Sequence, residues 1–307
     1  MLILVAGVTG NLGQKMIDSL HSRGHQIRGL GRHPSKLDLS RRKKLESFIR
    51  SENYYDVPAL DRACKGVDAV ICVYTGIPEL ALEGQLLLLR AAERAGVKKY
   101  VASSWSYNWK DMQLGVHESY DPFICFRNQV ELTSDLKPIY FFTGVLAEVL
   151  FSLPGHGDFS PANNGVWDPE RKTMDIWGTG EEIWHWTTER DAAEFTAAVI
   201  GGDDAVKGGF WTLCSGSGTL QQIAETYGKV RDREVIVQKR GSLEELRERA
   251  LEAREKGKRN MFWPYIGWFY QLFTVDGTTW ALGELDNHKL DVKVTSLEEF
   301  LSNNPEL

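Results

Sequence analysis

A glycine-rich turn near the start of the chain is the first segment whose residues could do chemistry. Residues 7–13 read Gly-Val-Thr-Gly-Asn-Leu-Gly and directly follow the apolar run Leu2–Ala6. Glycines at this spacing allow a tight turn and let backbone approach a pyrophosphate, whose charge then rests on the N-terminus of the following helix. The turn therefore predicts a dinucleotide site. The alternative is an ordinary glycine-rich connection between a strand and a helix.

Two basic residues after the second expected strand indicate which dinucleotide is bound. NAD-binding proteins place Asp or Glu about 20 residues beyond the glycines, where the carboxylate holds the ribose hydroxyls. Here residues 29–36 read Gly-Leu-Gly-Arg-His-Pro-Ser-Lys, and no acid follows until Asp38. Arg32 and Lys36 suit a 2′-phosphate instead, because a guanidinium fork matches phosphate geometry. We therefore expect NADP(H) as the cofactor, the alternative being a solvated basic loop.

The elements that must position these residues alternate short apolar runs with helical patterns. Continuous Val, Ile and Leu runs separated by helices indicate a parallel sheet covered on both faces. The expected strands span residues 2–6, 26–30, 69–73, 100–103 and 139–144, and the expected helices span 14–22, 59–64, 84–95 and 128–136. The fold class is therefore α/β, a Rossmann-type doubly wound parallel sheet that binds ligands at the carboxyl ends of its strands.

The second half of the chain is less regular, and we expect it to form a smaller, interleaved C-terminal substrate lobe. Residues 150–187 combine Gly, Pro, Asn and aromatic residues with little periodicity. Helices are expected at 188–200, 219–230, 242–256 and 296–301, and a strand at 210–214; Ser242 and Glu245 are spaced as a capping box. The predicted division is 1–150 for the NADP-binding domain, joined by segments near 188–214, and 151–307 for a mostly α/β lobe.

The composition is typical of a packed protein with a small-molecule ligand. Of the 307 residues 42% are apolar and 25% charged, and the formal net charge is −6. The charges are mixed along the chain, which argues against nucleic acid or membrane as a partner. No spacing resembles a metal site, and the four cysteines form no Cys-x-x-Cys pair, which favours a reduced compartment. The sequence shows no signal-peptide pattern and no apolar run of about 18 residues, so we expect a cytoplasmic protein. We expect it to be a monomer or a homodimer.

Further segments accompany the glycine turn and the Arg32/Lys36 pair. Residues 65–71 read Lys-Gly-Val-Asp-Ala-Val-Ile and residues 95–101 read Ala-Gly-Val-Lys-Lys-Tyr-Val. With 188–198 and 295–301, these segments resemble the NmrA-like, isoflavone-reductase-like family of atypical short-chain dehydrogenases/reductases. The resemblance implies a Rossmann core, a C-terminal substrate lobe, NADPH as the usual cofactor and, in many relatives, reduction of small aromatic metabolites. Other members bind the nucleotide as regulators without turnover.

The resemblance also implies roles for individual residues, carried over by position. The pyrophosphate would be wrapped by the glycine turn, through Gly7, Thr9, Gly10, Asn11, Leu12 and Gly13. Arg32 and Lys36 would take the 2′-phosphate. Tyr74 and Thr75 would lie along the ribose on the adenosine side and the pyrophosphate. The nicotinamide would be bordered by the residues at the end of the strand at 100–103, namely Ser103, Ser104 and Trp105.

The residues that would move protons depart from the family pattern. Extended short-chain dehydrogenases use Tyr-x-x-x-Lys, whereas residues 107–110 read Tyr-Asn-Trp-Lys, one residue too short. Isoflavone-reductase relatives carry a lysine where this chain has Arg127, at the start of the helix expected at 128–136. An arginine holds its proton too tightly to relay it near neutral pH. We expect Arg127 to face the nicotinamide, and a proton to come from Tyr107, His117, Tyr120 or water.

Three classes of function remain open from the sequence. The first is an NADPH-dependent oxidoreductase for a bulky aromatic or polycyclic metabolite. The second is a non-redox enzyme on the same scaffold, such as a dehydratase, isomerase or cyclase, and the third is an NADP-binding sensor that regulates a protein partner. Aromatic residues are dense at 105–109, 177–186 and 261–270. They would either line a pocket for a flat substrate or fill the core of the smaller lobe.

Overall fold

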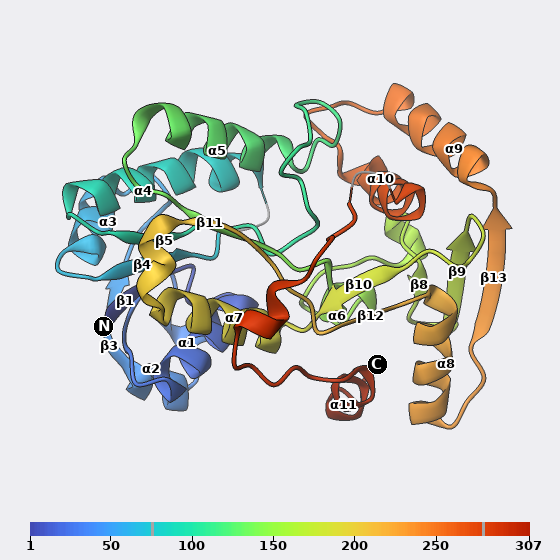
Figure 1. Cartoon of the computed structure of the whole chain (residues 1–307), viewed down its shortest axis with the longest axis horizontal. Coiled ribbons are helices and arrows are strands. Elements are labelled where there is room, and N and C mark those ends of the chain that lie inside the picture. Colours follow the sequence, from blue (N-terminus) through green and yellow to red (C-terminus); the bar gives the residue numbers. More distant parts are fainter. Residues whose placement is uncertain (75–76, 278–279) are drawn as a thin grey trace.

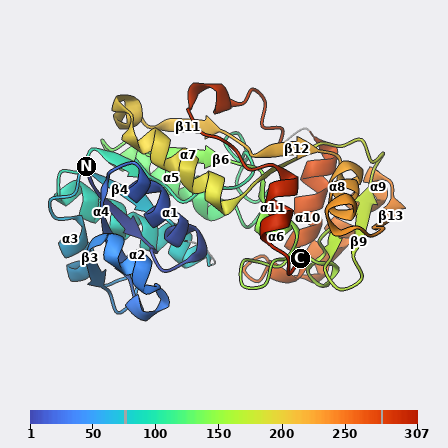
Figure 2. The same ribbon diagram turned by 90° about the horizontal axis from the view of Figure 1, so that it is seen from below.

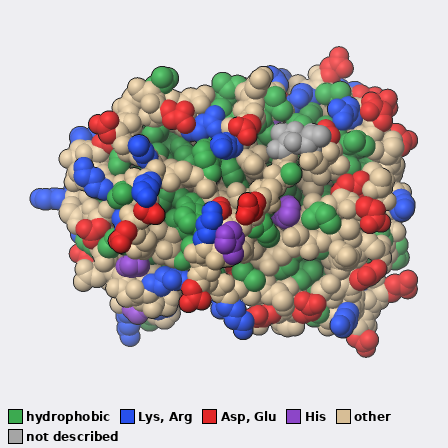
Figure 3. Space-filling view, viewed as in Figure 1, with side chains coloured by type: hydrophobic (Ala, Val, Ile, Leu, Met, Phe, Trp, Pro, Cys, Tyr) green, Lys and Arg blue, Asp and Glu red, His purple; other side chains and the backbone are tan. Residues whose placement is uncertain are grey.

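The computed structural model describes residues 1–74, 77–277 and 280–307. A parallel sheet with its helices forms one half of the molecule, and two small sheets with further helices form the other (Figure 1). Figure 2 shows the two halves side by side, with α1 (Asn11–Ser22) and α4 (Gln85–Arg94) in one and α8 (Leu220–Arg231) and α9 (Leu243–Lys256) in the other. On the face seen in Figure 3, Lys and Arg side chains are interspersed with Asp and Glu. Among the described helices, none is long and apolar enough to cross a bilayer.

The main sheet has seven strands, all parallel, in the order β11-β6-β5-β4-β1-β2-β3. The order reverses between β1 and β4, which is the switch point at which Rossmann folds bind dinucleotides. The expected Rossmann-type α/β fold is therefore confirmed. The strands are β1 (Leu2–Ala6), β2 (Gln26–Gly31), β3 (Leu45–Arg50), β4 (Ala69–Cys72), β5 (Lys99–Val101), β6 (Ile139–Phe142) and β11 (Gly209–Thr212).

Alternate residues of β1 face opposite layers of helices, as the period of a strand requires. Ile3 and Val5 pack with the apolar faces of α1 (Asn11–Ser22) and α7 (Glu189–Gly201). The other face of β1 packs with the remaining layer, which holds α3 (Val57–Cys64), α4 (Gln85–Arg94) and α5 (Asp121–Thr133). Helices therefore cover the sheet on both faces, which buries its apolar strands and leaves their carboxyl ends open to ligands.

The second half holds two three-stranded sheets, in the orders β12-β10-β7 and β13-β9-β8. The strands are β7 (Val145–Leu146), β8 (Trp167–Asp168), β9 (Thr173–Trp177), β10 (Trp184–Thr187), β12 (Gly216–Gly218) and β13 (Ile236–Gly241). The helices are α6 (Ala147–Leu150), α8 (Leu220–Arg231), α9 (Leu243–Lys256), α10 (Trp263–Asp276) and α11 (Leu297–Asn303). α2 (Leu39–Lys44) and short turns at Pro34–Lys36, Leu80–Gly84, Pro161–Asn163, Asp203–Lys207 and Asp286–Lys289 complete the elements.

The chain passes between the two halves more than once. After α6 and the small strands β8 to β10 it returns as α7 and β11, and β11 pairs with β6 at the edge of the main sheet. It then re-enters the second half at β12, which pairs with β10. The main sheet and its covering helices are thus built from two stretches of sequence, and residues of the second half lie between these stretches.

Several elements differ from the sequence-based expectations. The expected start of the helix at residue 128 is wrong: α5 begins at Asp121, where Pro122 occupies the first turn, a position that suits the fixed φ of proline. β3, β13 and α10 have no expected counterpart. The capping box of Ser242 and Glu245 is confirmed at the N-terminus of α9.

Candidate functional site

The glycine turn brings the start of α1 close to the ends of β1 and β4. Gly7 has a φ of +86°, and a Cβ there would lie 2.9 Å from the carbonyl oxygen of Val73. A Cβ on Gly13 would overlap the Gly7 carbonyl oxygen and the Val8 backbone. Gly10 is less confined, with its nearest contact at 3.4 Å. Any side chain at positions 7 or 13 would push the helix away from the strand, so these glycines set the shape of the turn.

A first pocket lies at the carboxyl ends of β1, β2 and β4, and we name it the basic pocket. It contains both cations that the sequence singled out, Arg32 and Lys36, and none of the described residues that line it is acidic. The Arg32 guanidinium lies 4.9 Å from the centre of the Tyr54 ring, a cation–π distance that fixes its position. The lining residues are Gly7, Thr9, Gly10, Leu30, Gly31, Arg32, Lys36, Ser51, Tyr54, Val73, Tyr74 and Leu80.

These residues fit the phosphate-bearing end of NADP(H). Two cations without a neighbouring carboxylate favour a dianionic 2′-phosphate over ribose hydroxyls. Ser51 and Tyr54 belong to the same wall and were not identified from the sequence, because they follow β3, which was not expected. Tyr74 lines this pocket, whereas Thr75 lies outside the described residues.

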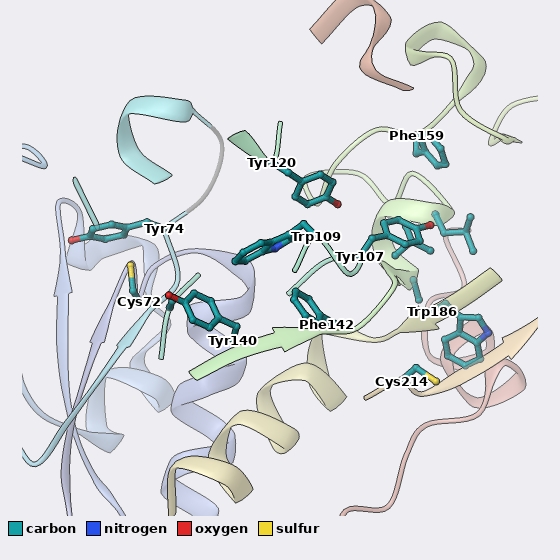
Figure 4. Packing of buried hydrophobic residues seen from close by; sticks show 14 of the residues in the cluster. Cys72, Tyr74, Tyr107, Trp109, Tyr120, Tyr140, Phe142, Phe159, Trp186 and Cys214 are labelled. Carbon is teal, nitrogen blue, oxygen red and sulfur yellow. The ribbon is translucent and has the colours of Figure 1, made fainter. Parts of the chain in front are cut away.

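A second pocket, of about 330 Å³, lies beyond the ends of β5 and β6, and we name it the aromatic pocket. The main-sheet half contributes Trp105, Ser106, Tyr107, Tyr120 and Gly144, and the adjoining β7 and α6 contribute Val145, Leu146 and Val149. The opposite wall consists of Gly157, Asp158, Phe159, Asn163, Trp263, Ile266, Gly267 and Tyr270. Figure 4 shows Tyr107 and Tyr120 together with Phe159 around this region. Its walls are mostly apolar with few polar groups, which suits a flat organic molecule.

Helix α10 forms much of the far wall and is docked by backbone contacts. Gly267 lies so close to the turn at Pro161–Asn163 that a Cβ there would overlap the carbonyl oxygen of Asn163. The Gln271 side chain donates a hydrogen bond of 2.6 Å to the carbonyl oxygen of Asn164. In return, the Asn164 amide donates to the carbonyl oxygen of Pro264 at 2.9 Å. These contacts hold Tyr270 and Trp263 of α10 against the aromatic pocket.

One contact connects the glycine turn with the aromatic pocket. The Asn11 amide nitrogen donates a hydrogen bond of 2.8 Å to the carbonyl oxygen of Gly155. Two residues further on, Gly157 begins the segment that lines the aromatic pocket. A ligand that extends from the basic pocket across the glycine turn would therefore reach the aromatic pocket at its other end. Of the turn residues, Asn11, Leu12 and Gly13 support this geometry without lining either pocket.

A buried acidic pair lies behind the same segment. Both carboxylate oxygens of Glu148 accept from the backbone N–H of Glu189, at 3.1 Å, at the start of α7. Burial, reinforced by the Glu189 carboxylate, raises the pKa of Glu148 to about 7. His156 lies 2.9 Å from a Glu189 oxygen, and this hydrogen bond raises the pKa of the imidazole.

The structure brings two of the expected proton donors to the aromatic pocket and places a third behind it. Tyr107 and Tyr120 line the pocket, and each hydroxyl is buried without a hydrogen-bond partner among the described residues. Burial raises the pKa of both phenols. His117 is fully buried against the Tyr120 ring, with 4.9 Å between ring centres, and does not line the pocket. Both tyrosines are neutral near pH 7, as proton donors must be.

Arg127 lies elsewhere. It belongs to the middle of α5, where its guanidinium donates to the Lys110 carbonyl oxygen and lies 5.7 Å from the centre of the Trp109 ring. A longer contact of 3.7 Å joins it to Glu131. Arg127 lines neither the basic nor the aromatic pocket. The early start of α5 accounts for this placement, because Arg127 lies almost two turns into the helix instead of at its N-terminus.

The three residues after β5 divide between structure and site. The Ser103 hydroxyl donates to the Tyr74 carbonyl oxygen at 2.5 Å, and Ser104 accepts from the backbone N–H of Phe141 at 2.8 Å. Both serines are buried and line neither pocket. Trp105 lines the aromatic pocket, with its indole N–H bonded to the Thr196 hydroxyl at 2.9 Å. Ser103 and Ser104 therefore fix the strand ends, and only Trp105 reaches the cavity.

Known proteins resemble this chain both in sequence and in fold. The chain is 26% identical over 247 residues to a bifunctional pinoresinol-lariciresinol reductase of Linum usitatissimum, covering 74% of each chain. The fold matches a structure titled AtPrR2 with NADP+ and (+)pinoresinol, with a TM-score of 0.74, 20% identity and coverage of 98% and 97%. It also matches the binary complex of leucoanthocyanidin reductase and NADPH from Vitis vinifera, with a TM-score of 0.75, 16% identity and 99% coverage of both chains.

The family model that matches this chain is described as the NmrA-like family, and the match runs over residues 1–301. It includes the glycine turn, the basic pocket and both walls of the aromatic pocket. The resemblance noted in the sequence is confirmed: the chain belongs to the NmrA-like family.

Proposed function

We propose that this protein is an NADP(H)-dependent oxidoreductase that acts on a bulky aromatic metabolite. The observation that carries the proposal is the arrangement of two unlike pockets about one glycine turn. The basic pocket offers Arg32 and Lys36 to a phosphate, and the aromatic pocket offers a cavity of about 330 Å³ with tyrosines in its wall. The Asn11–Gly155 hydrogen bond connects the glycine turn with the segment that leads to the aromatic pocket, and a dinucleotide bound across the turn would extend toward that pocket.

The relatives support the same assignment. The curated relative from Linum usitatissimum is a bifunctional pinoresinol-lariciresinol reductase, and AtPrR2 has been solved with NADP+ and (+)pinoresinol. A bound NADP(H) would supply the hydride-transfer chemistry. The protein's own contribution is to bind the phosphate with Arg32 and Lys36, to exclude water with the aromatic walls, and to hold proton donors at Tyr107 and Tyr120.

Arg127 does not belong to this proposed proton chemistry. Its guanidinium contacts Lys110, Trp109 and Glu131 and not the lining of either pocket. The lysine of isoflavone-reductase relatives therefore has no replacement at this position, and the tyrosines of the aromatic pocket are the proton donors that we propose instead.

Purified protein tests the proposal in two steps. Calorimetric titration with NADPH and NADH should show a preference for NADPH. NADPH absorbance is then followed with pinoresinol and with other bulky aryl ketones and ethers, using Gly13→Val as the variant without a cofactor site. Consumption of NADPH with a matching reduced product supports the proposal. Equal affinity for both cofactors together with no NADPH oxidation by any of these substrates contradicts it.

A non-redox enzyme is the second candidate, and Arg127 is the observation that favours it. A chain without the family's lysine lacks one part of reductase chemistry, whereas dehydration or isomerisation can proceed with the pocket tyrosines alone. Product formation without a change in NADPH absorbance would select this candidate.

A further inference from the structure

A chain of hydrogen bonds leads from the wall of the aromatic pocket to the buried His117. Tyr270 of α10 lines the pocket, and its hydroxyl lies 2.9 Å from the Ser119 Oγ. The same Ser119 oxygen lies 2.9 Å from Nδ1 of His117. Each of these groups can both donate and accept, because hydroxyl protons rotate and a neutral imidazole has one donor and one acceptor nitrogen. The three residues thus provide a continuous path for a proton.

The surroundings of His117 are unusual for a structural histidine. Its ring is fully buried, and Nε2 has no hydrogen-bond partner among the described residues. Five aromatic rings enclose it, with ring centres at 4.7 to 6.3 Å, contributed by Tyr120, Phe269, Tyr270, Phe273 and Trp280. Faces of aromatic rings attract cations, so this enclosure offsets part of the loss of solvation when the imidazole is protonated.

The charged groups around this enclosure are themselves paired. Glu118 accepts from Arg254 at 2.9 Å and from the Tyr265 hydroxyl at 3.1 Å, and its contact with Arg259 is 3.3 Å. Burial, followed by the charge of Arg254, holds the pKa of His117 well below its ordinary value. Asp121, at the start of α5, is the other nearby acid in the described part of the chain, and it accepts from the backbone N–H of Gly115. His117 is therefore neutral at rest.

We propose that Tyr270, Ser119 and His117 form a proton relay that exchanges a proton with an oxygen of the molecule bound in the aromatic pocket. The inference rests on the proposed function, which supplies the class of bound molecule: a flat aromatic compound with a hydroxyl or carbonyl group. Tyr270 is the catalytic residue that touches this molecule, and Ser119 and His117 act through it.

Each transfer in the relay balances. In the acid direction, the imidazolium of His117 gives its Nδ1 proton to Ser119, and Ser119 gives its own hydroxyl proton to Tyr270. Tyr270 gives its hydroxyl proton to the bound oxygen, so the molecule gains one proton, both hydroxyls are restored and His117 ends neutral. In the base direction the same transfers run in reverse and end with the imidazolium. Water that enters the empty pocket restores the balance by the same route: it supplies the proton that forms the imidazolium before an acid step, and it takes that proton away after a base step.

The test uses the imidazole nitrogens of His117 as its readout and requires no turnover. Protein labelled with a nitrogen isotope in its histidines is examined by NMR, and His117→Gln assigns the signals. The probe is β-naphthol, and naphthalene is the matched probe without a hydroxyl. Fluorescence measures the affinity of each probe independently. We expect β-naphthol, and not naphthalene, to shift the Nδ1 signal of His117.

Two variants interrupt the path, and a third serves as their control. Ser119→Ala and Tyr270→Phe should bind β-naphthol with a Kd within about tenfold of wild type and abolish the shift at His117. Tyr227→Phe removes the hydroxyl of a buried tyrosine that lines neither pocket and should preserve the shift. Unfolding midpoints for all three variants show whether each is folded.

Three results with β-naphthol would overturn the relay. They are a bound β-naphthol that leaves His117 unchanged, an equal shift in folded Tyr270→Phe, and a pocket that binds no β-naphthol. In a further outcome, the His117 shift follows the expected pattern while none of the tested substrates causes oxidation of NADPH. That result would support the relay and contradict the reductase assignment. NADPH oxidation that Tyr270→Phe and Ser119→Ala leave unchanged at every pH would retain the reductase and remove the relay.

Discussion

Glu148 is the residue at which a single substitution should stabilise the protein. The residue is 6% exposed, and both of its carboxylate oxygens accept from the backbone N–H of Glu189. Burial raises its pKa from 4.5 to about 7 in the folded state. We therefore expect Glu148→Gln, a neutral side chain of the same shape, to raise the free energy of unfolding at alkaline pH. The glutamine oxygen can still accept from the Glu189 N–H.

The expected size and pH range follow from the direction of this pKa shift. Below pH 4.5 the carboxyl is protonated in both the folded and the unfolded chain, so its ionisation affects stability little. As the pH rises toward 7, the unfolded chain loses the proton first, and the folded state becomes progressively less stable. Above pH 7 the full penalty is reached, about 3 kcal/mol, because a tenfold change in acid dissociation corresponds to about 1.4 kcal/mol.

Urea unfolding of wild type and Glu148→Gln at pH 5 and pH 8 measures this effect. The variant should exceed wild type by about 2–3 kcal/mol at pH 8 and by clearly less at pH 5. Glu225→Gln, an exposed glutamate of α8, is the matched control and should show no such difference between the two pH values. A Glu148→Gln protein that is no more stable than wild type at pH 8, or equally stabilised at both pH values, would refute the reasoning.

Three further predictions concern the binding of NADPH. Arg32→Ala should weaken NADPH binding by roughly ten- to a hundredfold and leave NADH binding nearly unchanged, since a charge-assisted phosphate contact is worth about 1.5–3 kcal/mol; equal losses for both cofactors in calorimetry would refute it. Gly13→Val should abolish NADPH binding or folding, because its side chain would overlap the Gly7 carbonyl oxygen; retained affinity with an unchanged melting temperature would contradict this. Arg127→Ala should keep wild-type affinity for NADPH and lose about 1 kcal/mol of stability, through its contacts with Lys110 and Trp109; a large loss of affinity would place Arg127 in the cofactor site.

The parts of the site that the sequence predicted are those that local geometry determines. Gly7 and Gly13 are constrained by backbone a few residues away or on the next strand, so their spacing alone signals the turn. Arg32 and Lys36 immediately follow β2, and the end of a parallel strand fixes on which edge of the sheet they lie. Both residues line the basic pocket, and the positions of the first two strands in the sequence are enough to predict this.

The parts that it did not predict depend on packing between distant segments. β3 is an edge strand that is only partly buried, and its exposed Glu46 and Arg50 interrupt the apolar pattern by which the inner strands are recognised. Because β3 was not predicted, Tyr54, which follows it in the sequence, was not predicted as a pocket residue either. Tyr270 reaches the aromatic pocket because α10 docks on a turn about 100 residues earlier in the chain, through Gln271 and Asn164. No periodicity reports such a contact. Pro122, by contrast, indicates the start of α5 in the sequence itself, because proline is favoured in the first turn of a helix.

The return of the chain to the main sheet at β11 bears on how this protein is made. During synthesis, the first six strands leave the ribosome before α7 and β11 do, because these follow only at Glu189–Gly201 and Gly209–Thr212. Until then, the apolar face that includes Ile3 and Val5 lacks its α7 cover, and β6 is an open edge. Uncovered faces and unpaired edges promote aggregation in nascent chains. A fragment that stops near residue 150 should therefore precipitate or bind chaperones, whereas one that continues past β11 can close its sheet.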